Sequence, residues 1–370
     1  MTRHQMSPFT HHISCSLWGR ECCCSNTFLP KISMNDWPVE LISYVFELAC
    51  TDAGRTVHSL SLTSKKLREI ARPFLYQSLL ISSLGQLITL LKKWEKTPAH
   101  LRRIRHLFLS IDHDPHSHDT CSADASLVIG ALQNVADGLR TLTLVAPCQF
   151  TGTSILSYLF RLSFPLLEEL TIAGLYAYSF QTGNFPRLQR LHFAAGNRNP
   201  RGLFQFGALD KAFPQLTRLR VSGLSRALPF VDELERALEN GGNRQDESLA
   251  LPPRLERLYV ECTSTSPSPL SSRRPSRSSS TTDLALSFPV PSITDDRQRM
   301  MIERLTDLEG KYGAQSNNRA SVELVVLDST SSSGASGYGN TDQETDVAAR
   351  LKQDWLDRLD GRDGPWKIKA

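Results

Sequence analysis

The feature that most constrains the fold is a short apolar pattern that recurs along the chain. An apolar residue is followed by two variable residues, an apolar residue, one variable residue and a third apolar residue. Repetition of this kind indicates stacked units, because a single unit cannot bury its apolar face alone. Three copies follow the same dipeptide: Phe164-Pro165, Phe185-Pro186 and Phe213-Pro214. The copies are Ile104/Leu107/Leu109, Leu139/Leu142/Leu144, Leu167/Leu170/Ile172, Leu188/Leu191/Phe193, Leu216/Leu219/Val221, Leu255/Leu258/Val260 and Val322/Val325/Leu327.

Amphipathic stretches separate these copies, so each unit is predicted to be a short strand, a turn and a helix. Strand side chains alternate between the two faces of a sheet, and the second and third apolar residues of each copy should therefore point inward together. We expect an α/β array over residues 82–328. The sequence leaves open whether its strands form one continuous sheet, and the gap from Val260 to Val322 is where a break would fall. The expected helices cover residues 84–94, 124–136, 154–162, 203–212, 229–239 and 296–309.

Residues 35–81 precede the array and show helical spacing. Leu41, Val45 and Leu48 recur three or four residues apart after Pro38, which suits a first helical turn because its missing N–H needs no partner there. Pro73 should end a second helical stretch. The pattern predicts a short helical domain with an extended exit.

Composition sets the class of protein. The chain has 370 residues, a net charge of +4 and eight cysteines that form no secreted disulfide framework. No apolar run approaches the length of a membrane span. We therefore expect a chain of the cytoplasm or nucleus, with reduced thiols, no membrane partner, no nucleic-acid partner and no cofactor.

Several segments fall outside the repeats. Residues 1–34 should be a disordered leader, with Met34 as a possible internal start, and residues 263–290 and 329–346 should be flexible because their Ser, Thr, Pro and Gly content cannot bury a core. Residues 347–370 are expected to form a helix that caps the array.

Residues 36–81 resemble the F-box, especially in its fungal form. The resemblance rests on Pro38, Glu40, Leu41, Ile42, Val45, Phe46 and Leu48, on residues 60–71, and on Pro73-Phe74-Leu75-Tyr76; Trp37 replaces the usual leucine. The copies that follow are similar to divergent leucine-rich repeats. Together they imply a three-helix F-box followed by an irregular right-handed solenoid.

The resemblance implies a non-enzymatic substrate receptor of a cullin-based ubiquitin ligase. In the family, the F-box binds a Skp-type adaptor, which links to a cullin, and the repeats bind a protein substrate. The alternative is a repeat scaffold that acts outside the ligase. Adaptor contact is carried over to Trp37, Pro38, Leu41, Ile42, Val45, Phe46, Leu60, Leu62 and Leu67, although several of these could instead be the domain's own core.

The inner sheet face is the expected substrate site. Neighbouring strands lie about 4.8 Å apart, so residues from adjacent copies should gather there. The gathered side chains would make a cationic patch suited to an acidic or phosphorylated peptide, and the alternative is an ordinary solvated face. The patch comprises Arg190, His192, Arg218, Arg220, Arg257 and Tyr259.

One further segment has metal-ligand residue types. Asp112, His113, Asp114, His116 and the nearby Cys121 could bind zinc in principle, but no second distant ligand pair accompanies them. We expect no specific metal site.

Overall fold

The computed structural model describes residues 37–111, 121–176, 180–206, 208–240, 251–263, 293–313, 322–327 and 340–367. The expected leader, almost all of the 263–290 insertion and the Asp/His run at 112–119 lie outside these ranges. Among the described residues, no helix has both the length and the apolar character needed to cross a membrane.

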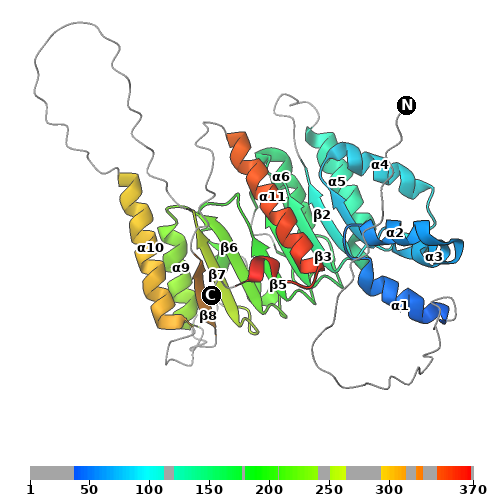
Figure 1. Ribbon diagram of the computed structural model, residues 1–370. Helices are drawn as coiled ribbons and strands as arrows, with labels where there is room; N and C mark the ends of the chain where they lie inside the picture. Colours follow the sequence, from blue (N-terminus) through cyan, green and yellow to red (C-terminus); the bar gives the residue numbers. More distant parts are fainter. Residues whose placement is uncertain are drawn as a thin grey trace, which may run out of the picture.

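The described residues build one parallel sheet of eight strands, arranged in the order in which they occur in the chain (Figure 1). This is the alternating strand–helix architecture that the recurring pattern predicts. The strands are β1 (Ser78–Ile81), β2 (His106–Ser110), β3 (Thr141–Val145), β4 (Glu169–Ala173), β5 (Arg190–Phe193), β6 (Arg218–Leu224), β7 (Arg257–Cys262) and β8 (Glu323–Leu327).

The strand register aligns the copies of the apolar pattern with one another. Leu142 pairs with Leu107 on one side and with Leu170 on the other, and the row continues across the sheet. All its members are buried on one side of the sheet, the helix-covered face, where burial of one leucine contributes about 1.5–3 kcal/mol. The row is Leu107, Leu142, Leu170, Leu191, Leu219, Leu258 and Leu324.

The repeated Phe-Pro dipeptide has a packing role. Phe164 stacks on Phe185 with ring centroids 5.5 Å apart, and Phe185 lies 5.5 Å from Phe213. The three rings are fully buried. They form a continuous aromatic row at the start of consecutive units, which explains why the dipeptide recurs in register.

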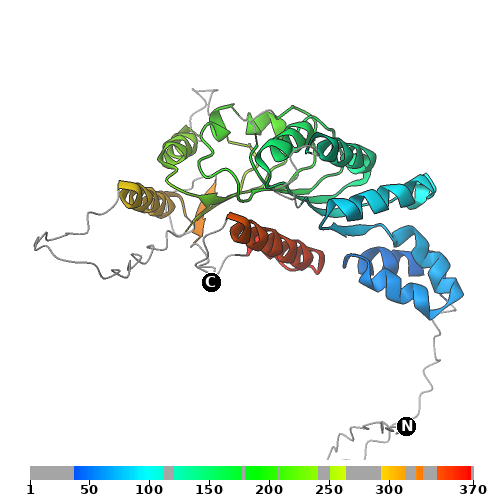
Figure 2. The ribbon, with the colours of Figure 1, turned by 90° about the horizontal axis from the view of Figure 1, so that it is seen from above.

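A layer of helices covers one side of the sheet (Figure 2), and the leucine row is buried beneath it. The expected helices are confirmed, except that the stretch at 203–212 is split into two single turns. The helices of this layer are α4 (Leu84–Glu95), α5 (Cys121–Val135), α6 (Gln149–Leu159), α7 (Leu203–Phe206), α8 (Leu209–Ala212), α9 (Leu228–Asn240) and α10 (Ile293–Tyr312), with short 3-10 turns η3 (Ala99–Leu101) and η5 (Ala136–Gly138).

The first helices form a small unit beside β1. This N-terminal helical unit comprises α1 (Val39–Ala49), α2 (Arg55–Thr63), α3 (Lys65–Ala71) and η2 (Arg72–Phe74), with a core of its own around Ile42 and Phe46. Gln77 donates a hydrogen bond to the Glu47 carbonyl (2.7 Å), and Ser78 donates one to the Thr51 carbonyl (2.9 Å). These bonds fix the unit to the end of the sheet.

The structure settles two points about the strands and corrects a third. The segment expected as an extended exit is β1, which pairs with β2. The sheet has no break after Val260, because β7 pairs with β8. The last copy of the pattern is displaced by one residue: Leu324 and Val326 pair with Leu258 and Val260, whereas Val325 aligns with Tyr259. A one-residue displacement moves every side chain to the other face.

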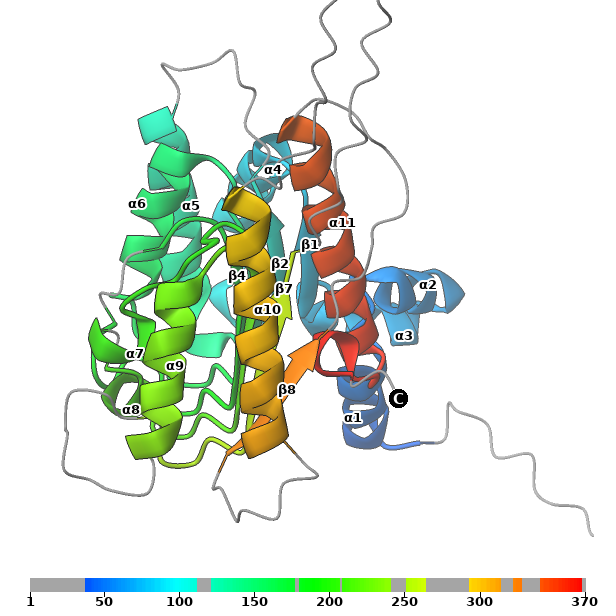
Figure 3. The same ribbon diagram turned by 90° about the vertical axis from the view of Figure 1, so that its left-hand side faces the viewer.

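The C-terminal helix occupies an unexpected place. α11 (Asn340–Leu359) and the 3-10 turn η6 (Gly364–Trp366), together called the C-terminal segment, do not cap the array after β8. They lie on the sheet face opposite the other helices, where α11 packs on β2 and β3 (Figures 2 and 3). Residues 340–346, expected to be part of a loop, are helical.

Close packing of the turns after β4 and β5 requires glycine. Gly174 and Gly196 have φ angles of +144° and +123°, which side chains rarely tolerate. A Cβ atom at Gly196 would lie 2.5 Å from the Gly174 carbonyl carbon. The two turns therefore nest against each other, backbone to backbone.

Candidate functional site

The first candidate site is an exposed apolar stripe on α1. Leu41, Tyr44 and Leu48 follow one another at helical spacing, and their exposed fractions are 54%, 62% and 62%. Trp37 and Val45 extend the stripe. Contiguous large apolar side chains left outside a small helical unit are typical of a protein interface. We call these five residues the α1 stripe.

The structure divides the residues predicted to contact an adaptor. Trp37, Pro38, Leu41, Val45 and Leu62 are exposed, as an interface requires. Ile42 and Phe46 are instead fully buried in the unit's own core. Leu60 and Leu67 are half-buried against that core.

Two members of the α1 stripe, Tyr44 and Leu48, were not among the predicted contacts. The sequence did carry a signal for them. α1 has apolar residues on two sides, Ile42/Phe46 and Leu41/Tyr44/Val45/Leu48, and so small a unit can bury only one of them.

The second candidate site is the sheet face beneath the C-terminal segment, which we call the α11 face. The register brings the predicted residues together there: Arg190 pairs with Arg218 and Arg218 with Arg257, while His192 pairs with Arg220 and Arg220 with Tyr259. The predicted clustering is therefore confirmed. The face is nevertheless covered, since His192 and Tyr259 are 1% and 0% exposed.

Three arginines of the α11 face are paired with acids of the same sheet. Arg190 Nε lies 2.9 Å from Glu169 Oε2. Arg220 is paired with Glu261 at 2.8 Å, and Arg257 with Glu323 at 2.7 Å. Arg218 is half-buried beside them. Arg190, Arg220 and Arg257, on which an acidic ligand was predicted to bind, are therefore already engaged in ion pairs.

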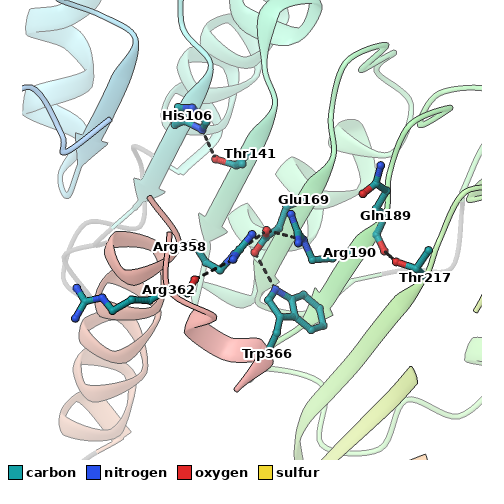
Figure 4. A network of polar contacts seen from close by, with 9 residues as sticks. All are labelled: His106, Thr141, Glu169, Gln189, Arg190, Thr217, Arg358, Arg362 and Trp366. Atoms are coloured by element: carbon teal, nitrogen blue, oxygen red, sulfur yellow. Dashed lines mark hydrogen bonds and ion pairs between the residues drawn. The ribbon is translucent and has the colours of Figure 1, made fainter. Parts of the chain in front are cut away.

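Glu169 is the centre of the network (Figure 4). Its carboxylate is buried and receives donors from two parts of the chain. Arg190 approaches from the sheet, while Arg358 Nε (3.1 Å) and the Trp366 indole N–H (2.9 Å) approach from the C-terminal segment. A buried carboxylate needs such donors, because transfer of an unpaired charge out of water is expensive.

Glu261 is a second buried acid on the same face. Arg350 of α11 donates to it at 3.2 Å, in addition to the sheet's Arg220. Burial opposes its ionisation, but the two arginines outweigh that effect and lower the pKa of the carboxyl group. Arg220 also donates to the Pro365 carbonyl.

Along α11, an apolar contact lies between the two arginines that reach these acids, Arg350 and Arg358. Phe108, Val145 and Ala173 of the sheet pack against Leu351 and Trp355 of α11. The Trp355 ring lies 5.9 Å from that of Phe108. The C-terminal segment is therefore held by an aromatic anchor between charge-assisted hydrogen bonds.

The interface is imperfectly filled. Among the described residues, His192 Nδ1 and Trp355 Nε1 are buried without a hydrogen-bond partner. A cavity of about 20 Å³, measured as space open to the centre of a water molecule, lies between Thr143, His192 and Asp354. Burial, with Arg220 and Arg350 nearby, holds the pKa of His192 well below its usual value.

The described residues offer little for metal or thiol chemistry. No group of three or more His, Cys, Asp or Glu side chains gathers among them as a metal site would require. Burial raises the pKa of Cys50 and of Cys262 to about 11, so both thiols stay protonated and are poor nucleophiles. The Asp112–His116 run lies outside the described residues.

No protein-family model matches the chain, and no curated protein is significantly similar to it.

Proposed function

We propose that the chain is a substrate-recognition subunit of a cullin-based ubiquitin ligase. The N-terminal helical unit acts as an F-box that binds a Skp-type adaptor, and the sheet array acts as an irregular right-handed leucine-rich-repeat solenoid that binds a protein substrate. The chain makes and breaks no bond. It raises the effective concentration of a substrate lysine beside a ubiquitin-charged conjugating enzyme.

The observation that carries the proposal is the α1 stripe. Leu41, Tyr44 and Leu48 point away from the unit's core, although three exposed large apolar side chains on one short helix serve no purpose in the isolated chain. The hydrogen bonds from Gln77 and Ser78 fix α1 to the sheet. An adaptor bound to the α1 stripe would thus be held rigidly relative to the array.

The array supports the same proposal. Its strands follow one another in order, each unit contacts mainly its neighbours, and one leucine row runs through all but the first strand. This neighbour-to-neighbour arrangement is characteristic of solenoids, which present extended binding surfaces. β1 carries Leu79 in the corresponding position.

Co-purification with a Skp-type adaptor tests the proposal. The variant Leu41→Glu/Leu48→Glu places two charges in the α1 stripe, and we expect adaptor affinity to fall at least about thirtyfold, as for loss of an interface hot spot. The matched control is Ile302→Glu, which charges an exposed apolar residue of α10 far from α1.

The control variant should bind the adaptor like the wild type, and circular dichroism should give one unfolding temperature for all three proteins. A stable wild-type chain that fails to bind any Skp-type adaptor would instead favour the repeat scaffold that acts outside the ligase. Equal loss of binding in both variants would also contradict the proposal, since the effect would not depend on the stripe.

A further inference from the structure

The residues of the α11 face that bind the C-terminal segment most specifically are two acids. Glu169 and Glu261 are 6% and 5% exposed, and both accept hydrogen bonds from the C-terminal segment. The donors on that segment are two guanidinium groups and an indole N–H. The face therefore recognises basic and aromatic groups. From its arginines, the sequence had instead predicted an acidic ligand.

The C-terminal segment shows the spacing that this recognition requires. Leu351, Trp355 and Arg358 lie on one side of α11, four and three residues apart, and Trp366 follows in η6. Leu351 and Trp355 fill the apolar contact, while Arg358 and Trp366 reach Glu169. Anchor residues at this spacing are typical of an amphipathic helix that binds to the surface of another protein.

The resident segment does not satisfy the surface fully. Each buried polar atom without a hydrogen-bond partner costs about 1–3 kcal/mol, and among the described residues this interface holds several, including His192 Nδ1, Tyr259 Oη and Trp355 Nε1. The nearby cavity shows that contact is incomplete at the same place. A different helix with a polar side chain opposite His192 would bind better.

The segment also meets the N-terminal helical unit. Thr51 Oγ1 donates to the Leu359 carbonyl at 3.3 Å, and Ala53 packs beside the apolar contact of α11. Removal of α11 would break this bond and expose the connection between α1 and α2. Whether the α11 face is occupied therefore changes contacts of the N-terminal helical unit, which carries the α1 stripe.

From these observations we propose that the α11 face is an exchangeable docking surface for an amphipathic helix that bears arginine and tryptophan side chains. The chain's own C-terminal segment is its resident ligand, and a partner helix of the same chemistry displaces it. The identification of that partner as the ubiquitin-ligase substrate rests on the proposed function; the docking itself does not.

A synthetic fluorescent peptide of residues 340–367 is the probe. In the full-length wild type, the resident segment competes and the peptide should bind weakly. In the full-length variant Arg358→Glu/Trp366→Ala, the resident segment loses its hold on Glu169, and we expect the peptide to bind at least about tenfold more tightly by fluorescence anisotropy. The peptide carrying the same two substitutions should not bind.

Arg362→Glu is the matched control for charge. Arg362 lies on the same segment but pairs only with Asp357 and Asp360 of that segment among the described residues. This variant should bind the peptide as weakly as the wild type. Equal peptide affinity in the double variant and the wild type, with both folded by circular dichroism, would overturn the proposal.

A second measurement covers the case in which the double variant does not fold. A protease site is inserted between residues 327 and 340 of the otherwise unchanged chain, and the cleaved protein is incubated with excess isotope-labelled peptide. Exchange of the resident segment, followed by native mass spectrometry, supports the proposal. Absence of exchange, or aggregation as the segment leaves, identifies the segment as a permanent part of the fold. Neither readout involves the adaptor, so this test and that of the α1 stripe can fail separately.

Discussion

The two faces of the sheet are covered in different ways. On the helix-covered face, the leucine row and the aromatic row are buried under a layer of helices and form one large apolar core. On the α11 face, a single helix and a short turn cover ion pairs, a few apolar contacts and, among the described residues, several polar atoms without a hydrogen-bond partner. The helix layer forms the main core of the fold, whereas the C-terminal segment packs on a sheet that this core already stabilises.

The difference shows how one sheet can serve two purposes. Burial of leucine on the helix-covered face is non-directional and scales with area, so it stabilises the array whatever lies opposite. The contacts of Glu169 and Glu261 are directional and chemically selective. Selectivity on one face is therefore compatible with stability supplied by the other.

The largest expected effect follows from truncation in the leucine row. Leu191 is fully buried in the middle of the sheet, and Leu191→Ala should lower the free energy of unfolding by about 2–5 kcal/mol, through lost transfer free energy and the resulting cavity. Urea unfolding followed by circular dichroism measures this. A loss well under that range would mean that the helix-covered face is not the main source of stability.

A smaller loss is expected from Trp355→Ala on the α11 face. Trp355 is larger than leucine and nearly as well buried as Leu191, but α11 can detach locally, so the cost cannot exceed the free energy with which it docks. We expect a loss of about 2 kcal/mol or less in the same urea experiment. Hydrogen exchange in α11 should accelerate while that in β4–β6 remains unchanged. A cost equal to that of Leu191→Ala would remove the distinction between the faces.

The smallest effect is a pH dependence that arises from two histidines of the α11 face. Burial, with Arg105 and Arg140 nearby, lowers the pKa of His106 from 6.5 to about 4, and His192 is lowered as well. The unfolded chain therefore takes up these protons first as the pH falls below 6.5, and stability is lost progressively towards pH 4.

Between pH 7 and pH 5.5 the expected loss is on the order of 1 kcal/mol for His106. This range lies above the titration of most carboxyl groups, including Glu261, whose pKa is lowered. His106→Gln/His192→Gln should flatten the dependence, as measured by urea unfolding at the two pH values. An unchanged slope in that variant would assign the pH dependence to other groups.

Much of the fold could be predicted from local pattern, but its last copy could not. The leucine row was readable because each strand offers two apolar positions with polar neighbours. β8 reads Glu323-Leu324-Val325-Val326-Leu327, where either alternation is apolar, so the sequence alone does not decide the register. β1 was missed because Leu79 lies in a strand without a full copy of the pattern.

The sequence predicted those parts of the candidate sites that depend on neighbouring strands. The clustering of Arg190, Arg218 and Arg257 followed from strand geometry. The ion pairs of Arg190 and Arg257 and the cover by α11 depend on contacts between residues far apart in the chain, such as Trp366 and Glu169, which are 197 residues apart. No periodicity in the sequence reports such a pairing.

The place of α11 in the chain has a consequence for synthesis. A ribosome releases the N-terminal parts of a chain first and adds about 5–20 residues per second. The eight strands are complete at Leu327, whereas the helix that shields Phe108, Glu169 and Glu261 begins only at Asn340. During translation the sheet therefore emerges with one face bare, and a premature stop before residue 340 would leave it bare for the lifetime of the product.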